Sequence, residues 1–184
     1  MPKAPDPRLS ERIAKAALQL LDEGGSKAIT MRSVAASAGI AITTIYERFA
    51  DRNALLEGVV ALVQRDLIAA VESARSVDVF AKAYIEFFCR YPHRYAMSME
   101  AFDSRLATGQ PMPVLAKFKQ LLARKTGLKG STLDDRALAI ASLTFGTLRS
   151  MINVGLDRRR ASELRRACLS AIRQLTTPAK PKKG

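Results

Sequence analysis

Residues 33–56 read SVAASAGIAITTIYERFADRNALL, and two threonines, a tyrosine and an arginine gather at the centre of this stretch. The spacing predicts a short helix over residues 42–49, directly after an Ala-Gly turn. On a helical wheel Ile45 and Phe49 share one face, which can pack on the preceding helices, while the threonines and the tyrosine point away. This polar surface is either plain solvent-exposed surface or a recognition face.

The residues before this helix favour recognition. Thr30 is a suitable N-cap for a helix over residues 31–38, and Ala35 is small enough to allow close helix packing. Gly39 ends that helix and suits the left-handed backbone that a tight turn needs. Two short helices joined in this way make a helix-turn-helix, whose second helix enters the major groove of double-stranded DNA. The pattern therefore predicts that residues 42–49 contact DNA.

Seven side chains are candidates for this DNA contact. We expect Thr43 near the bases, and we expect hydroxyl and guanidinium groups to bind phosphate oxygens. Arg32, at the start of its helix, is placed to reach a guanine. Ile42 fits either a thymine methyl or packing against the preceding helix. The full set is Arg32, Ile42, Thr43, Thr44, Tyr46, Arg48 and Arg52.

Over about residues 9–60 the sequence resembles the TetR family of bacterial transcriptional repressors. The resemblance is carried by the first amphipathic helix, the Thr30 start, VAASAGI, TTIY, Phe49, and Arg52 ahead of Leu55-Leu56. It implies a homodimer with two N-terminal DNA-binding heads on a palindromic operator. It also implies a helical body with a pocket for a small-molecule effector, whose binding releases the DNA.

Three positions depart from the family pattern. Ala41 stands where a capping Ser or Thr is common, and the loss of such a cap costs about 1 kcal/mol. Arg48 replaces a frequent His, and Arg52 replaces a frequent Lys. Both arginines keep or add positive charge beside the predicted recognition helix.

Helical periodicity continues along the chain, and strand alternation is nearly absent. A first helix ends at Gly24-Gly25 and carries an apolar stripe, and Asp51 is placed to cap a long helix that reaches about Arg75. The stripe consists of Ile13, Ala16, Ala17, Leu20 and Leu21. Further helices are expected over residues 77–91, 94–107, 111–126, 133–156 and 160–176.

The predicted fold class is all-α. An N-terminal three-helix helix-turn-helix DNA-binding domain is expected over residues 1–52. A larger helical effector-binding and dimerisation domain is expected over residues 53–176. The composition of residues 177–184, TPAKPKKG, predicts a disordered basic tail.

The helical body is rich in aromatic side chains. Nine of the eleven aromatic residues lie between Phe80 and Phe145. At helical spacing most of them should form the core, but aromatic and methionine side chains with polar anchors also line apolar pockets. Because the resemblance implies an effector pocket, its candidate residues are Tyr84, Phe87, Phe88, Met99, Phe102, Arg105, Phe118, Phe145 and Arg149.

The last two long helices are the predicted dimer interface, because the family dimerises through them. The first of them carries small residues on roughly one face, which would let another helix approach closely. These are Ala137, Ala141, Ser142 and Gly146; the final helix offers Leu164, Ala167, Cys168, Ala171, Ile172 and Leu175. The competing interpretation is that both are ordinary core helices of a monomer.

The net charge of +13 indicates an anionic partner, with nucleic acid ahead of membrane. Residues 1–60 carry 8 Lys/Arg and 7 Asp/Glu, so the positive excess lies outside the helix-turn-helix. The segment from Arg158 onward has nine Lys/Arg and one Glu, and is either a solvated surface or a nonspecific DNA contact. The alternative function is therefore a DNA-binding protein without a ligand, which relies on its basic body and tail.

Other classes of protein lack support in the sequence. The chain has no apolar run of 18 residues and no signal-peptide pattern, so we expect a cytoplasmic protein without membrane contact. Cys89 and His93 are four residues apart, but Pro92 interrupts their helix and no further ligand is near. The motifs GxSxG, GxGxxG and Walker A are missing, so neither an enzyme nor a cofactor is expected.

Overall fold

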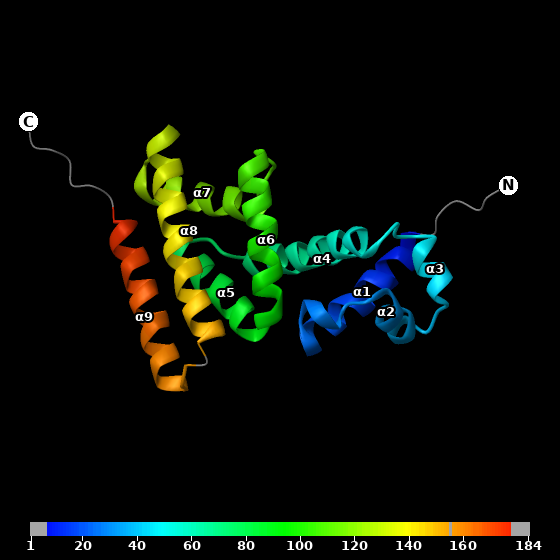
Figure 1. The fold of residues 1–184 in the computed structure, drawn as a ribbon. Coiled ribbons are helices and arrows are strands. Elements are labelled where there is room, and N and C mark those ends of the chain that lie inside the picture. Colours follow the sequence, from blue (N-terminus) through cyan, green and yellow to red (C-terminus); the bar gives the residue numbers. More distant parts are fainter. Residues whose placement is uncertain (1–6, 155, 178–184) are drawn as a thin grey trace, which may run out of the picture. The chain divides into compact units, whose positions relative to one another are not determined.

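The computed structural model describes residues 7–154 and 156–177, and this part of the chain contains helices and no strand (Figure 1). The all-α prediction is therefore confirmed. No helix in these ranges is both long and apolar enough to cross a membrane. The elements are α1 (Pro7–Gly24), a 3-10 helix η1 (Ser26–Ala28), α2 (Met31–Ala38), α3 (Ile42–Tyr46), α4 (Arg52–Glu72), α5 (Val77–Arg90), α6 (Pro92–Thr108), α7 (Pro113–Thr126), α8 (Gly130–Asn153) and α9 (Arg158–Leu175).

Every helix predicted from the sequence is present. The difference in helix bounds that matters most for function is at α3. The prediction of a helix over residues 42–49 was too long, because the α-helix ends at Tyr46. The carbonyl of Ile45 accepts both the Arg48 N–H, at 2.9 Å, and the Phe49 N–H, at 2.8 Å, which tightens the final turn. The basic tail of residues 178–184 lies outside the described residues.

The apolar stripe of α1 is wider than its pattern suggested. Three of the predicted residues, Ile13, Ala17 and Leu21, are fully buried. Ala16 and Leu20 are half-buried, and Ala14 and Leu18, which the predicted stripe did not include, are buried as well. The reason is that α1 packs against α2, η1 and α6, so that more than one side of the helix is covered.

The chain forms two compact units. The head unit comprises the described residues through Asp66 together with Tyr91–Gln110, and the body unit comprises Leu67–Arg90 and the described residues from Pro111 onward. The head unit therefore holds α1 to α3, most of α4, and α6. These units differ from the expected division after residue 52, because α6 packs on α1 and joins the head.

The body unit is built around aromatic side chains of α5, which packs against α7, α8 and α9. Phe80 lies 5.3 Å from Phe118 of α7 between ring centroids, and Tyr84 meets Phe88 edge-on at 5.1 Å. Ile140 of α8 and Ile172 of α9 are almost fully buried in the same unit. Burial of this apolar surface is the main stabilising contribution to the unit.

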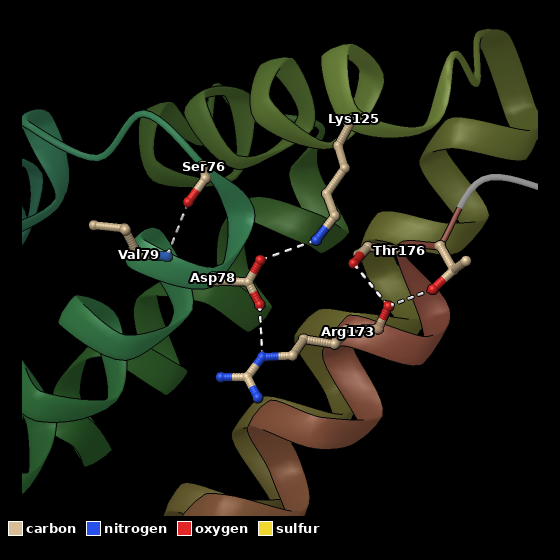
Figure 2. Close-up of polar contacts among 7 residues, drawn as sticks. Ser76, Asp78, Val79, Lys125, Arg173 and Thr176 are labelled. Carbon is tan, nitrogen blue, oxygen red and sulfur yellow. Dashed lines mark hydrogen bonds and ion pairs between the residues drawn. The ribbon is translucent and has the colours of Figure 1, made fainter.

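Asp78, in the first turn of α5, connects α5 to the C-terminal ends of two other helices (Figure 2). One carboxylate oxygen accepts from Nζ of Lys125 at 2.9 Å, and the other accepts from Nε of Arg173 at 3.0 Å. These partners lower the pKa of Asp78 below its ordinary value, with the Lys125 hydrogen bond as the largest cause. Position adds to the effect, because a carboxylate near a helix N-terminus is favoured by the helix dipole.

Replacement of Asp78 by Asn should make the protein less stable at neutral pH by about 0.5–1 kcal/mol, since both ion pairs are partly solvent-screened. A lowered pKa contributes stability that is present above the unfolded pKa and is lost as pH falls through the folded pKa. The difference between parent and Asp78→Asn should therefore be constant from pH 7 to about pH 4 and shrink below it. Urea unfolding across this range measures it.

Asp135→Asn is the control, because Asp135 is an exposed carboxylate on α8 of the same unit. It should show a much smaller change in the free energy of unfolding. A pH-independent difference for Asp78→Asn would contradict the assignment of the ion pairs.

Candidate DNA-binding site

The first helix of the helix-turn-helix, α2, begins at a complete capping box. The Thr30 hydroxyl accepts from the Ser33 N–H at 3.0 Å, and the Ser33 hydroxyl accepts from the Thr30 N–H at 2.9 Å. The Ser33 hydroxyl also donates to the carbonyl of Ala28 at 2.7 Å. The predicted cap is therefore confirmed, and it joins α2 to η1 as well as starting the helix.

The turn between the two helices depends on the backbone of Gly39. Its φ of 65° is left-handed, and the N–H of Ile40 returns to the carbonyl of Ala35 at 3.1 Å. A Cβ added at Gly39 would meet no atom within 4 Å. The glycine is therefore needed for its conformation and not for space.

Two apolar side chains fix the orientation of α3. Ile45 is fully buried, and Phe49 is half-buried with its ring against Gly58, where a Cβ would lie 3.3 Å from Cε1 of Phe49. The predicted inward pair is thus confirmed. Ala41 provides no side-chain hydrogen bond to the start of α3, so packing by Ile45 and Phe49 holds the helix.

The opposite face of α3 is open. Tyr46 is 54% exposed, Thr43 is exposed, and Thr44 is half-buried. Ile42 is 39% exposed, so DNA contact and packing against α2 both stay predictions for this side chain. We call these four side chains the α3 face.

The two arginines predicted to contact DNA beside the α3 face differ in exposure. Arg32, on α2, is exposed. Arg48 is half-buried, and its Nε is buried without a hydrogen-bond partner among the described residues. A buried donor without a partner costs free energy, and a phosphate oxygen is the acceptor that suits a guanidinium.

Arg52 has a structural position that sequence reasoning missed. Its Nε donates to the carbonyl of Ile29 at 2.8 Å, and its Nη2 donates to the carbonyl of Ser26 at 2.7 Å. The first residue of α4 is thereby tied to the segment just before α2. DNA contact by Arg52 stays a prediction, and it would have to use the donors left over from these two bonds.

The nine candidates for an effector pocket divide between the two units. Met99, Phe102 and Arg105 lie on α6 in the head unit, where Arg105 donates to Oε1 of Gln64 at 2.6 Å. The other six lie in the body unit: Tyr84, Phe87, Phe88 and Phe118 are buried, Phe145 is half-buried, and Arg149 is exposed. The buried rings contact one another as core side chains do, so the pocket stays a prediction.

The segment that contains the helix-turn-helix is similar to known DNA-binding regulators. Residues 13–59 match the sequence model of the tetR family of bacterial regulatory proteins. This segment is a TetR-family domain. It contains most of α1, all of α2 and α3, and the start of α4, which are the elements that form and support the α3 face.

Solved structures extend the likeness to the whole TetR-family fold. A tetR-family transcriptional regulator from Streptomyces coelicolor has a TM-score of 0.72 at 15% identity, with 93% of this chain and 81% of that chain covered. A second regulator from that organism has a TM-score of 0.70 at 18% identity, with 90% and 94% covered. The chain therefore has the fold of a TetR-family transcriptional regulator.

The multidrug binding protein EbrR, solved in complex with imidazole, is also similar. Its TM-score is 0.63 at 18% identity, with 96% of this chain and 94% of that chain covered. No curated protein matches the chain by sequence. At these identities the likeness concerns the fold of the chain and not its ligands.

Replacement of Arg52 by Met should lower the free energy of unfolding by about 1–2 kcal/mol, because two charge-assisted hydrogen bonds are lost and two carbonyls lose a donor. Arg52→Lys should recover part of this loss, since one ammonium cannot match both bonds of the guanidinium fork. Urea denaturation monitored by circular dichroism gives the comparison.

Arg32→Met is the matched control, as it removes an exposed arginine from the same unit. It should leave the free energy of unfolding within about 0.5 kcal/mol of the parent. Equal effects of the Arg32 and Arg52 variants would contradict the structural position of Arg52.

Proposed function

We propose that the protein is a sequence-specific transcriptional repressor, which binds a palindromic operator as a homodimer and is released by a small-molecule effector. The observation that carries the proposal is the α3 face, which is exposed on a helix held in place by Ile45 and Phe49. It lies inside the segment that matches the TetR family.

The chemistry of the α3 face suits the major groove. Thr43 and Ile42, at the helix N-terminus, are positioned for base edges and thymine methyl groups. Thr44 and the exposed Tyr46 supply hydroxyl donors for phosphate oxygens. Arg48 adds a guanidinium whose Nε lacks an acceptor within the described chain.

The low net charge around the helix-turn-helix favours DNA recognition by shape and hydrogen bonding over general electrostatic attraction to phosphates. Residues 1–60 are almost neutral, with 8 Lys/Arg against 7 Asp/Glu. If Arg32 and Arg48 of both heads neutralise four phosphates, log K should fall with log salt at a slope of about −4. A markedly steeper slope would favour the alternative of a DNA-binding protein that relies on its basic body and tail.

Homodimerisation is proposed through α8 and α9. Cys168 and Ile172 of α9 were expected at the interface, but both are buried within the body unit. On α8, the predicted Ala137 is also fully buried and Ala141 is half-buried, whereas Ser142 and Gly146 are exposed on one side of the helix together with Ala139. A Cβ at Gly146 would meet nothing within 4 Å, so no contact in the described chain requires a glycine there.

A glycine inside an exposed helix costs about 1 kcal/mol relative to alanine. Close approach of a second helix offsets such a cost, because small residues let two backbones pack tightly. The exposed side of α8 therefore supports dimerisation, which would place two α3 faces on one operator. A two-fold dimer requires a palindromic site with half-sites about one turn of DNA apart, or a multiple of it.

Release by an effector is the part of the proposal that rests on fold likeness. EbrR shares the fold, and its structure contains imidazole. The aromatic side chains of α5 and α7 give the body unit an apolar interior of the kind in which small molecules bind. An effector acts only if its affinity differs between the DNA-bound and the free state of the dimer.

Selection from a random duplex library should yield a palindromic site, and fluorescence anisotropy should then show tight binding by the parent. Tyr46→Phe removes one hydroxyl per head, and should weaken binding about tenfold or more, since each hydrogen bond is worth about 1 kcal/mol. Thr44→Ala/Tyr46→Ala should abolish specific binding.

Thr132→Ala, at an exposed position on α8, is the matched control for removal of a hydroxyl and should bind like the parent. Selection that enriches no sequence, or equal binding by the double variant, would overturn the α3 face as the recognition surface.

Gly146→Leu should separate folding from association. The described chain leaves room for the side chain, so the melting temperature of the monomer fold should not fall, while the dimer dissociation constant should rise about tenfold or more. Sedimentation equilibrium measures the association, with Ala69→Leu, at an exposed position on α4, as a control for an added leucine. A Gly146→Leu protein that dimerises like the parent would place the interface elsewhere.

A further inference from the structure

Among the charged residues that the structure describes, Arg94 of α6 is the one that is buried, with 6% of its surface exposed. A charge in a protein interior is tolerated only when it is paired and hydrogen-bonded. Sequence reasoning did not single out this residue, which follows Pro92-His93 at the start of α6. Its partners show what the buried charge does.

The Arg94 guanidinium joins three helices of the head unit. Its Nε and Nη2 donate to the two carboxylate oxygens of Asp22 at 2.7 and 2.6 Å, in a bidentate pair with α1. Its Nη1 donates to Asp66 of α4 at 2.8 Å. The guanidinium carbon lies 4.0 Å from the centroid of the Tyr91 ring. These contacts raise the pKa of Arg94, with the Asp22 hydrogen bonds as the largest cause.

Arg94 stabilises a carboxylate, that of Asp22, at an unfavourable position on α1. Asp22 lies in the last turn of α1, where the helix dipole disfavours a negative charge. The neighbouring turn provides a second contact with α6, because a Cβ at Gly25 would lie 3.2 Å from Nδ1 of His93. The start of α6 is therefore seated on the end of α1 at two points.

The end of α1 leads directly into the segment that positions α2. The N–H of Gly25 donates to the carbonyl of Leu21, and η1 follows. The carbonyl of Ser26 then holds Arg52, and the carbonyl of Ala28 holds the capping Ser33. An unbroken series of short contacts thus runs from Arg94 to the first helix of the helix-turn-helix.

We propose that Arg94 is a positioning residue for DNA binding. It fixes the end of α1 between α6 and α4, so that α6 is part of the DNA-binding unit and operator affinity depends on this ion pair. The inference rests on the proposed function for its DNA readout. The attachment of α6 itself is measured separately, by hydrogen exchange.

The test compares Arg94→Met, Arg94→Lys and Asp22→Asn with the parent, using the full chain. In Arg94→Met, amide exchange at residues 19–25 and 92–97 should accelerate about tenfold or more, because the local opening free energy falls. Operator affinity should weaken about tenfold in the same variant, while affinity for random DNA stays unchanged.

Arg94→Lys keeps the charge but loses the bidentate geometry, so it should restore part of the protection and part of the affinity. Arg12→Met is the charge-matched control, since Arg12 is an exposed arginine on α1 of the same unit. It should leave both readouts close to the parent. If Arg94→Met fails to fold, Arg94→Lys and Asp22→Asn carry the same comparison.

Three results would overturn the inference. Unchanged exchange at residues 19–25 would show that Arg94 does not hold α1 to α6. Faster exchange with unchanged operator affinity would show that the ion pair has no influence on DNA binding. An equal loss of affinity for operator and random DNA would indicate general damage to the fold instead of positioning. A parent that binds no operator is a distinct outcome, because it overturns the proposed function while the exchange result still decides the attachment of α6.

Discussion

The buried ion pair of Arg94 is the constraint on which the head unit depends. Its guanidinium binds carboxylates from α1 and α4, and the three helices meet there because a buried positive charge requires such partners. An apolar core can slide or repack at modest cost, whereas a bidentate pair has one favoured geometry. The end of α1 is therefore fixed in position as well as in burial.

In the helix-turn-helix that follows α1, some residues stabilise the fold and others are left exposed. Ile45 and Phe49 are turned inward and hold α3, while Thr43 and Tyr46 are left outside. Arg52 joins the start of α4 to the segment before α2, so a residue with the charge expected of a DNA contact also supports the fold. The α3 face can be short because its support comes from neighbouring helices and not from its own hydrogen bonds.

Positive charge is distributed unevenly along the chain. The chain has a net charge of +13, yet residues 1–60 are almost neutral, so the positive charge is carried mainly by later residues. Part of it is used internally: Lys125 and Arg173 bind Asp78 and draw α7 and α9 toward the start of α5 (Figure 2). A high net charge is therefore a poor guide to where this protein would contact DNA.

Short-range features were readable from the sequence for short-range reasons. The helical period, the Thr30 cap, the Gly39 turn and the inward pair of Ile45 and Phe49 involve residues within a few positions of one another. Each depends on backbone conformation and on the faces of a single helix, which neighbouring residues determine. The helix-turn-helix, and with it the family resemblance, could be predicted for this reason.

Tertiary structure alone decided which distant groups became partners. Arg94 and Asp22 are 72 positions apart, and Arg52 and Ser26 are 26 apart, so no local pattern links them. The same limit explains why α6 was assigned to the body and why Cys168 and Ile172 were offered to a dimer interface. An amphipathic pattern shows that a helix buries one face, but the identity of the surface that covers it is decided only when the helices pack.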